Sequence, residues 1–405
     1  METQRTLLQI NTVANYGSTG RIAEDIGVLA INSGWSSYIA YGRYGRSSQS
    51  ELVHISSFAG FQTHVLQTRL FDRQGLASRK ATKGFITEIR DLKPNLVHLH
   101  NLHGYYINIE VLFHYLSKTD IPVVWTLHDC WPITGHCVYF DFVKCNKWKH
   151  ECGSCIQKNK YPASYWLDRS TENFRLKRQL FNSLKNLTIV TVSNWLADIV
   201  SKSYLSSIPL VVINNGLDMS VFHRVADNTI RKKYNLERRF VILGVASKWD
   251  YRKGLYDFLE LSKSLDCTYT IILIGLSRQQ INSLPENILG IARTENIMEL
   301  VNIYNAADVY FNASIEETFG LTTIEAMACG TPSIVYNTTA CPEVISDDTG
   351  FIVEKGNLPG IIQAITTVKM NGKDYYTEAC IKRVRNLYNK TDRYSDYLKL
   401  YNSLI

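Results

Sequence analysis

The sequence predicts an α/β protein with two doubly wound domains. A chain of 405 residues with 45% hydrophobic content is long enough to bury two cores of ordinary size. Short apolar runs alternate with longer segments of helical periodicity, the pattern of parallel sheets that carry helices on both faces. The first such unit is the apolar run at 7–13, a loop with Gly17 and Gly20, and a helical segment after it.

The same alternation continues along the chain. In the N-terminal half, strands are predicted at 7–13, 37–41, 96–99, 123–127, 188–192 and 209–213. In the C-terminal half they are predicted at 240–245, 269–275, 288–291, 309–312, 333–335 and 350–353. Helices fill the intervals, including 297–305 and 322–329. Segment 63–93 mixes basic and apolar residues, which fits either a helix on a membrane surface or, with better odds, a solvated helix pair packed on the sheet.

A domain boundary is predicted near residue 213. An apolar strand meets the turn-forming sequence Asn-Asn-Gly-Leu-Asp there. We therefore expect an N-terminal Rossmann-like domain at 1–213, with a cysteine-rich insertion at about 130–160, and a C-terminal domain at 214–388. Residues 389–405 are expected to form a final helix that could cross back to the first domain.

Charge and hydropathy restrict the cellular setting. No run approaches the ~20 apolar residues of a membrane span, and the N-terminus lacks the apolar core of a signal peptide. We expect a cytoplasmic protein, with the inner face of the membrane as a second location. Residues 1–213 have a net charge of +8 and residues 214–405 of −1. The basic half suggests a phosphate-bearing acceptor or an anionic membrane surface as partner, although ordinary surface charge is an equal alternative. No nucleic-acid partner is expected.

Four of the nine cysteines lie within one short stretch. Cys137, Cys145, Cys152 and Cys155 have the spacing C-x7-C-x6-C-x2-C. Four thiolates can close a tetrahedral zinc site and hold together an insertion that is too short to build its own core. The alternative is a set of reduced cysteines in a packed loop. A structural zinc is thus one of two interpretations.

The most informative stretch is 314–332, SIEETFGLTTIEAMACGTP. Glu317 and Glu325 flank a glycine turn that leads into a helix, and the N-terminus of a helix favours an anion such as a diphosphate. The alternative is that Glu317 caps the helix and Glu325 lies on its solvent face. An unpaired carboxylate beside the small residues Ala-Met-Ala would be costly unless a polar group met it. The candidate ligand-binding residues of this stretch are Glu317, Phe319, Gly320, Leu321, Thr322 and Glu325.

Two other loops carry candidate residues. Lys253, directly before Gly254, is well placed for a diphosphate, and Arg252 can assist it. In the N-terminal half, histidine-rich sequences follow the strands at 96–99 and 123–127, and open α/β sheets bind ligands at these carboxyl ends. A lone histidine at such a place is usually a structural hydrogen-bonding group. The polar residues at these two strand ends are His100, Asn101, His103, His128 and Asp129.

The pattern E-x7-E followed by A-M-A-C-G-T-P resembles the signature of retaining glycosyltransferase family four, of the type found in bacterial polysaccharide biosynthesis. The resemblance extends over about residues 7–388. It implies the GT-B fold, with two Rossmann-like domains facing each other across a cleft. One departure stands out, because many family members have an arginine where this chain has Ser247, and Lys248 would have to replace its charge.

The resemblance also implies a reaction. A sugar would pass with retention from a UDP- or GDP-sugar to a glycan or a lipid-diphosphate-linked glycan in surface polysaccharide synthesis. No catalytic metal is expected, since the chain has no Asp-x-Asp motif. The catalytic residues would be His128, Glu317 and Lys253. The donor would also contact Gly17, Gly20, Lys248, Arg252, Arg293, Phe319, Gly320, Leu321, Thr322 and Glu325, and the acceptor would contact His100, Asn101, His103 and Asp129.

Two other classes remain. One is another enzyme of GT-B fold, such as an epimerase. The other is a catalytically weak protein that binds sugar nucleotides. The presence of Glu317, Glu325 and Lys253 together argues against a silent binding module.

Overall fold

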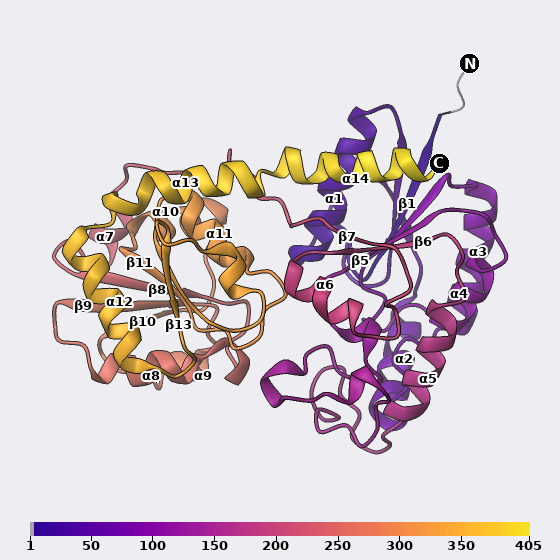
Figure 1. Ribbon diagram of the computed structural model, residues 1–405, viewed down its shortest axis with the longest axis horizontal. Helices are drawn as coiled ribbons and strands as arrows, with labels where there is room; N and C mark the ends of the chain where they lie inside the picture. Colours follow the sequence, from indigo (N-terminus) through magenta and orange to yellow (C-terminus); the bar gives the residue numbers. More distant parts are fainter. Residues whose placement is uncertain (1–3) are drawn as a thin grey trace. The chain divides into compact units, whose positions relative to one another are not determined.

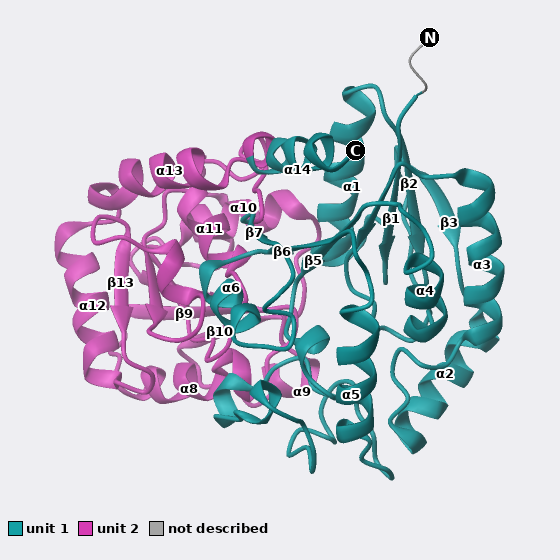
Figure 2. Ribbon diagram, turned by 45° about the vertical axis from the view of Figure 1, so that its right-hand side comes forward, with its two compact units in different colours: residues 1–214, 393–405 teal, residues 215–392 magenta. Residues whose placement is uncertain are grey.

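The structure is a computed structural model that describes residues 4–405 (Figure 1). The chain forms two compact units (Figure 2). Unit 1 contains the chain up to Asn214 together with Arg393–Ile405, and unit 2 is Asn215–Asp392. Each unit is built on one sheet whose strands are all parallel.

The sheet of unit 1 has seven strands in the order β3-β2-β1-β4-β5-β6-β7. They are β1 (Thr6–Asn11), β2 (Ser36–Tyr41), β3 (Glu51–His54), β4 (Leu96–Leu99), β5 (Val123–Leu127), β6 (Leu187–Thr191) and β7 (Leu210–Val212). The order reverses between β1 and β4, so the loops after these two strands leave the sheet on opposite sides. Such a switch point is where doubly wound sheets bind their ligands.

Helices follow most of these strands. They are α1 (Gly17–Asn32), α2 (Phe58–Phe71), α3 (Arg79–Leu92), α4 (Ile109–Leu116), α5 (Ser170–Phe181) and α6 (Asn194–Ser201). Local capping fixes several starts: the Ser57 side chain accepts a hydrogen bond from the Gly60 N–H at α2, and Asn108 accepts one from Val111 at α4. Between β5 and α5 lies a long insertion, whose helical turns are η1 (Trp131–Ile133), η2 (Asp141–Val143) and η3 (Lys147–Lys149).

The last helix, α14 (Lys390–Leu404), completes the core of unit 1. Its Tyr394, Tyr397 and Tyr401 are buried in a cluster with apolar residues of β1, α1, β4 and β5. The Tyr401 hydroxyl lies 2.6 Å from Nδ1 of His98, and the Tyr397 hydroxyl lies 3.1 Å from the Thr126 hydroxyl. Apolar burial and these two buried hydrogen bonds therefore hold the end of the chain against the first sheet.

The sheet of unit 2 has six strands in the order β10-β9-β8-β11-β12-β13. They are β8 (Phe240–Val245), β9 (Tyr269–Ile274), β10 (Ile288–Ile291), β11 (Val309–Asn312), β12 (Ser333–Tyr336) and β13 (Gly350–Val353). The helices are α7 (Thr229–Lys233), α8 (Leu255–Lys263), α9 (Arg278–Ile281), α10 (Ile297–Ala306), α11 (Leu321–Ala328), α12 (Leu358–Asn371) and α13 (Asp374–Tyr388), with the short turns η4 (Tyr251–Lys253) and η5 (Cys341–Val344). The switch point lies between β8 and β11.

The predicted α/β class and the alternation of strands and helices are confirmed. Segment 63–93 is covered by α2, α3 and the loop between them, so the helix pair is present. One strand was not predicted: β3 is an edge strand with a largely exposed sequence, so it has no continuous apolar run to reveal it.

Candidate active site

In unit 2, the candidate residues gather in the loops after β8 and β11, the two strands that flank the switch point. Lys253 belongs to the first loop and Glu317 to the second. The two loops touch at Gly254, whose φ of 72° and close approach both require glycine, since a Cβ there would lie 2.2 Å from the carbonyl oxygen of Ala313. The sheet thus brings together two segments about sixty residues apart in the sequence.

The centre of this site is an ion pair. The Lys253 ammonium contacts the carboxylate of Glu317, and both side chains are largely buried. The Ser314 hydroxyl donates to Glu317 Oε1 at 3.1 Å, and the Glu317 N–H donates to the Thr339 hydroxyl at 2.9 Å. Burial works to raise the pKa of Glu317, but the positive charges of Lys253 and Arg252 and the hydrogen bonds from Lys253 and Ser314 lower it below its usual value. The carboxylate is therefore ionised at neutral pH.

Helix α11 begins directly beside this pair. Gly320 precedes it with a φ of 102°, and no side chain caps its N-terminus. The positive end of the helix, three residues after Glu317 in the chain, therefore has no side-chain cap from Gly320. Phe319 is buried, so it supports the turn rather than presenting a surface.

Helix α11 also positions Glu325 and Thr322. The Tyr304 hydroxyl donates to Glu325 Oε2 at 2.7 Å, and the Tyr310 hydroxyl donates to the Thr322 hydroxyl at 2.7 Å. Glu325 therefore has the polar partner that its small-residue surroundings require. Tyr304 lies on α10, so the polar partner of Glu325 comes from a different helix.

The other candidates of unit 2 differ in exposure. Ser247 and Lys248, in the loop after β8, are exposed, as is Arg293 in the loop after β10. The Arg252 guanidinium donates through Nη1 to the carbonyl oxygen of Glu316 at 2.8 Å, so it braces the β11 loop. Lys253 is thus the cation closest to Glu317, while Lys248 and Arg293 lie at solvent-facing positions of the same sheet edge.

In unit 1, the loops after β1 and β4 meet at the other switch point. The Thr12 hydroxyl donates to the carbonyl oxygen of Asn101 at 3.0 Å, and the Asn101 N–H donates to Asn11 Oδ1 at 3.3 Å. Gly17 opens α1 with a φ of 64°, and a Cβ on Gly20 would come within 3.0 Å of the Val13 side chain. The glycines therefore let α1 start close under the β1 loop.

Beside these loops lies a chain of buried polar groups. His100 Nε2 is 3.1 Å from the amide oxygen of Gln9, and His100 Nδ1 is 3.1 Å from His128 Nε2. Burial lowers the pKa of His100 well below its usual value and lowers the pKa of His128 to about 4. Both rings are therefore neutral at neutral pH.

The hydrogen bonds of this chain define its proton positions. The Gln9 amide nitrogen donates to the carbonyl oxygen of Ala23 at 2.7 Å, so the Gln9 amide oxygen faces His100 and must accept. A neutral His100 then carries its proton on Nε2 and accepts at Nδ1. Nε2 of His128 consequently donates to His100, which fixes one tautomer of His128.

A second pair lies next to His128. His103 Nε2 is 2.6 Å from Asp129 Oδ2, and His103 Nδ1 is 3.1 Å from the Tyr161 hydroxyl. Burial works to raise the pKa of Asp129, but His103 and the Trp131 N–H lower it below its usual value. The structure therefore brings together the predicted acceptor-side residues His100, Asn101, His103 and Asp129 around His128, all within unit 1.

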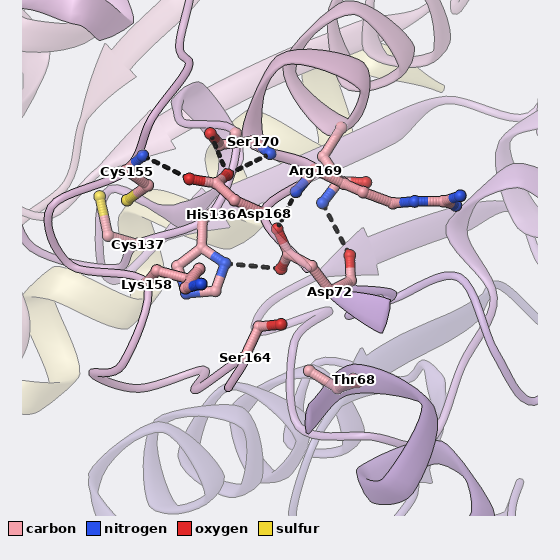
Figure 3. Close-up of polar contacts among 12 residues, drawn as sticks. Thr68, Asp72, His136, Cys137, Cys155, Lys158, Ser164, Asp168, Arg169 and Ser170 are labelled. Atoms are coloured by element: carbon pink, nitrogen blue, oxygen red, sulfur yellow. Dashed lines mark hydrogen bonds and ion pairs between the residues drawn. The ribbon is translucent and has the colours of Figure 1, made fainter. Parts of the chain in front are cut away.

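The cysteine loop brings the four predicted zinc ligands to one cavity. All nine cysteines are free thiols, and the four predicted ligands line one cavity of about 260 Å³. A hydrogen bond from Cys137 lowers the pKa of Cys155 to about 7, and Figure 3 shows these two sulfurs side by side. Among residues 4–405, no three His, Cys, Asp or Glu side chains converge closely enough to hold a metal ion. The structure thus gives the zinc interpretation no complete ligand set.

Several residues of these networks were not predicted. Gln9 and Tyr304 orient His100 and Glu325, Thr339 holds the backbone of Glu317, and Tyr161 bonds His103. None has a local sequence signal, because each lies at least twenty residues from the group that it orients. A buried glutamine within an apolar strand was the one available hint.

Solved structures share this architecture. Sucrose-phosphate synthase from Thermosynechococcus elongatus has a TM-score of 0.75 at 17% identity, with 99% of both chains covered. HepE from Anabaena, solved in complex with UDP, has a TM-score of 0.70 at 14% identity, covering 99% of this chain and 100% of that one. These similarities define the class of protein by its fold, GT-B.

The sequence comparisons are more specific. Residues 29–221 match the family described as Glycosyltransferase Family 4, and residues 237–371 match the one described as Glycosyl transferases group 1. A putative colanic acid biosynthesis glycosyl transferase, WcaC of Escherichia coli K12, is 24% identical over 373 residues, covering 88% of this chain and 89% of the relative. The capsular polysaccharide glycosyltransferase CapM of Staphylococcus aureus is 27% identical over 215 residues, covering 47% and 54%. The chain belongs to glycosyltransferase family 4, as its Glu317–Glu325 motif predicted.

The length and polarity of the helices test whether any of them could span a membrane. Among residues 4–405, the helices are all too short or too polar to cross a bilayer.

Proposed function

We propose that this glycosyltransferase moves a hexosyl residue, with retention, from a UDP- or GDP-sugar to a glycan or lipid-diphosphate-linked glycan during surface polysaccharide synthesis. The observation that carries the proposal is the buried Lys253–Glu317 pair at the switch point of unit 2, beside the uncapped start of α11. A cation and a helix N-terminus suit a diphosphate, and a carboxylate suits sugar hydroxyls.

Lys253 and Glu317 take different roles when a donor binds. The diphosphate competes with Glu317 for the Lys253 ammonium, which frees the carboxylate to accept hydrogen bonds from the sugar. The N–H groups at the start of α11 meet the same diphosphate. Glu325 accepts from the ribose hydroxyls, and Tyr304 holds it in place. Lys248 and Arg293 contribute at the exposed rim, next to phosphate and base.

The reaction needs stabilisation of the leaving group. The bond from the anomeric carbon to the diphosphate oxygen breaks, and the acceptor oxygen bonds to the same face of the sugar. The acceptor proton passes to the leaving phosphate. Negative charge grows on the diphosphate as the bond breaks, so Lys253 and the helix end stabilise the transition state more than the ground state. No catalytic metal takes part in the proposed step.

The polar groups of unit 1 serve the other substrate. His128, held as one tautomer by His100, offers a fixed neutral hydrogen-bonding group to a substrate hydroxyl. Asn101 and the His103–Asp129 pair bind acceptor hydroxyls. A polysaccharide role is supported by the relatives, because WcaC and CapM are named for colanic acid and capsular polysaccharide biosynthesis. We place the enzyme in the cytoplasm, at the inner face of the membrane where lipid-linked glycans are built.

A donor screen tests the proposal. Thermal shift with a panel of UDP- and GDP-sugars should identify one donor that raises the melting temperature. Release of the nucleotide from that donor should then require an acceptor extract. Conversion of the donor sugar without nucleotide release would indicate an epimerase. Binding without either reaction would indicate a sugar-nucleotide-binding protein.

The structural zinc in the cysteine loop stays a hypothesis with its own test. Elemental analysis that finds about one zinc per chain would support a closed four-thiolate site. A metal-free, active preparation would refute it.

A further inference from the structure

Helix α2 has an inverted polarity. Its buried residues are the polar His64 and Thr68, whereas Phe58 and Leu66 are exposed, with 57% of Leu66 accessible. A helix packed on a sheet normally turns its apolar stripe inward. Exposed apolar residues that stand together mark interaction surfaces when their exposure is fixed by the fold.

The inversion is fixed by hydrogen bonds. His64 Nδ1 lies 2.8 Å from the Ser78 hydroxyl, and the Gly75 N–H donates to His64 Nε2 at 3.2 Å. The Thr68 hydroxyl donates to the carbonyl oxygen of His64 at 2.9 Å. Rolling the helix to bury Leu66 would break both histidine bonds and leave buried polar groups unpaired. The outward position of Leu66 is therefore a property of the folded state.

The insertion adds an aromatic strip to the same end of α2. The Tyr165 N–H donates to the carbonyl oxygen of Arg69 at 2.7 Å, and the Leu167 N–H donates to that of Leu70 at 3.1 Å. Between them Trp166 stacks on Phe71, with ring centroids 6.4 Å apart, and 67% of Trp166 remains exposed. We call the exposed side chains here the docking face; they are Leu66, Phe71, Tyr165, Trp166 and Leu167.

Hydrogen bonds connect the base of this face to the end of α2. Asp72, the residue after α2, accepts from the Arg169 N–H at 2.9 Å and pairs with His136 Nδ1 at 2.6 Å (Figure 3). Asp168 accepts from the Cys155 N–H at 2.6 Å in the same view. These contacts tie the insertion to the end of α2, so the aromatic strip does not depend on a loose loop.

The charge around the face has one sign. Arg69, whose carbonyl oxygen accepts from the Tyr165 N–H, is exposed, and Lys158 donates to the carbonyl oxygen of Trp166 at 3.2 Å. Lys160, two residues after Lys158, is also exposed. Helix α2 contains no acidic residue, and the neighbouring Asp168 is held by the insertion's own N–H groups. Exposed Trp and Tyr with flanking cations are typical of proteins that lie in the interface of an anionic bilayer.

The basic residues of α3 lack this arrangement. Arg79 pairs with Glu110 at 2.8 Å, and Lys80 and Lys83 share the outer surface of the helix with Glu88. The apolar stripe of α3, with Phe85 at its centre, is buried. This is an ordinary solvated face, which offers no apolar side chain to a bilayer.

We propose that the docking face, with Arg69, Lys158 and Lys160, binds the surface of an anionic lipid bilayer. Leu66, Phe71 and Trp166 enter the headgroup region, and the cations contact lipid phosphates. The inference rests on the proposed function for its purpose, which is to hold the enzyme where a lipid-linked acceptor lies. Binding to the bilayer itself does not require catalytic turnover.

The test is flotation of the full chain with vesicles of phosphatidylcholine alone or mixed with phosphatidylglycerol, at low and high salt. One variant carries Leu66→Ser and Trp166→Ser, and a second carries Arg69→Gln and Lys160→Gln. Matched controls are Lys80→Gln with Lys83→Gln on α3, and Met370→Ser with Tyr375→Ser, two exposed apolar residues of unit 2.

We expect wild type to bind the anionic vesicles and to lose binding with salt. At low salt, removal of two cations should weaken binding roughly 25-fold, since each contributes about fivefold. The apolar variant should lose about tenfold or more at either salt concentration. Both controls should bind like wild type.

Three outcomes overturn the proposal: binding that ignores lipid charge, equal losses in the control variants, or wild type that stays in solution with both vesicle types. Self-association that only the apolar variant abolishes would assign the face to a second copy of the chain. Nucleotide release from the donor, with detergent-solubilised acceptor extract and without vesicles, should be the same in wild type and all four variants. A failure of the proposed function would instead abolish that release in wild type.

Discussion

The two switch points of this molecule share one sheet topology but differ in electrostatics. In unit 2, the loops after β8 and β11 bring a full positive charge against a full negative one, Lys253 and Glu317. In unit 1, His100, in the loop after β4 at the switch point, bonds Gln9 of β1 and His128 after β5, and burial keeps both histidine rings neutral. A charged pair can exchange partners with an ionic ligand, whereas a neutral chain can only orient hydroxyl groups. The difference suits a diphosphate donor in one unit and a hydroxyl nucleophile in the other.

The largest effect should follow from breaking the charged pair. Lys253→Ala removes the cation proposed to stabilise the leaving diphosphate and also leaves Glu317 without its main partner. We expect kcat to fall about 10²- to 10³-fold, measured as nucleotide release from the identified donor. Lys263→Ala, which removes an exposed lysine paired with Glu260, is the matched control and should leave kcat unchanged. Equal kinetics in both variants would remove Lys253 from the mechanism.

Mild acid should destabilise unit 1 before it destabilises unit 2. Burial lowers the pKa of His98 and His100 well below 6.5, and that of His128 to about 4. At pH values between these lowered pKa values and 6.5, the unfolded chain binds more protons than the folded one. The contribution of these histidines to the free energy of unfolding is therefore fully present above pH 6.5 and is lost as pH falls toward 4. The pKa of Glu317 is lowered from 4.5, so its contribution is lost only below pH 4.5.

Hydrogen exchange followed by mass spectrometry at pH 6.5, 5.5 and 4.5 is the measurement, with rates corrected for the intrinsic effect of pH. Peptides from β4 and β5 should lose protection first, with an opening free energy lower by on the order of a few kcal/mol. The His136 region is an internal contrast. Burial there works to lower the pKa of His136, but Asp72 raises it above 6.5, so the stabilisation from that pair is in place below pH 6.5 and does not weaken across this range. Simultaneous loss of protection in both sheets would contradict the expectation.

A smaller effect is expected from the neutral chain. Gln9→Met keeps the volume of the side chain but removes the acceptor that holds the His100 proton on Nε2. The fixed tautomer of His128 is then lost, and we expect kcat to fall roughly tenfold with little change in the donor KM. Nitrogen-15 spectra of labelled histidine should show His128 protonated on Nε2 in wild type and mixed in the variant. An unchanged tautomer with normal turnover would show that Gln9 only packs.

The smallest effect concerns ground-state binding. Glu325→Ala should raise the donor KM about tenfold, and Tyr304→Phe, which removes only the hydroxyl that donates to Glu325, about fivefold. Both should leave kcat nearly unchanged, because a ribose contact is the same in ground and transition states. Isothermal titration with the nucleoside diphosphate checks this directly. A loss of kcat without a change in KM would place Glu325 at the reacting bond instead.

Much of the fold was legible from local sequence. Buried parallel strands are continuous apolar runs, as at β8 and β9, and glycine marks the helix starts at Gly254 and Gly320. The exposed edge strand β3 was not predicted, because its side chains follow no apolar pattern. The inversion of α2 escaped as well, since the bonds that fix His64 come from residues outside the helix.

The sequence identified the residue types of the candidate site but not their pairings. Glu317 and Lys253 stood out through their motif and their glycine, yet only the strand order places them together. The sequence indicated that Glu325 needed a polar partner, but nothing local could identify Tyr304. The Gln9–His100 bond joins residues 91 positions apart through adjacent strands, so the tautomer of His128 depends on sheet register rather than on any motif.

The burial of α14 in unit 1 has a consequence for biosynthesis. Tyr394, Tyr397 and Tyr401 emerge from the ribosome only after every residue of unit 2 has been made. At typical elongation rates of about 5–20 residues per second, the first sheet waits roughly 10 to 35 seconds for the helix that covers it. The nascent chain thus exposes the unfilled side of β1, β4 and β5 during that interval, when a chaperone could bind it. Unit 2 can fold during translation, whereas unit 1, although made first, finishes last.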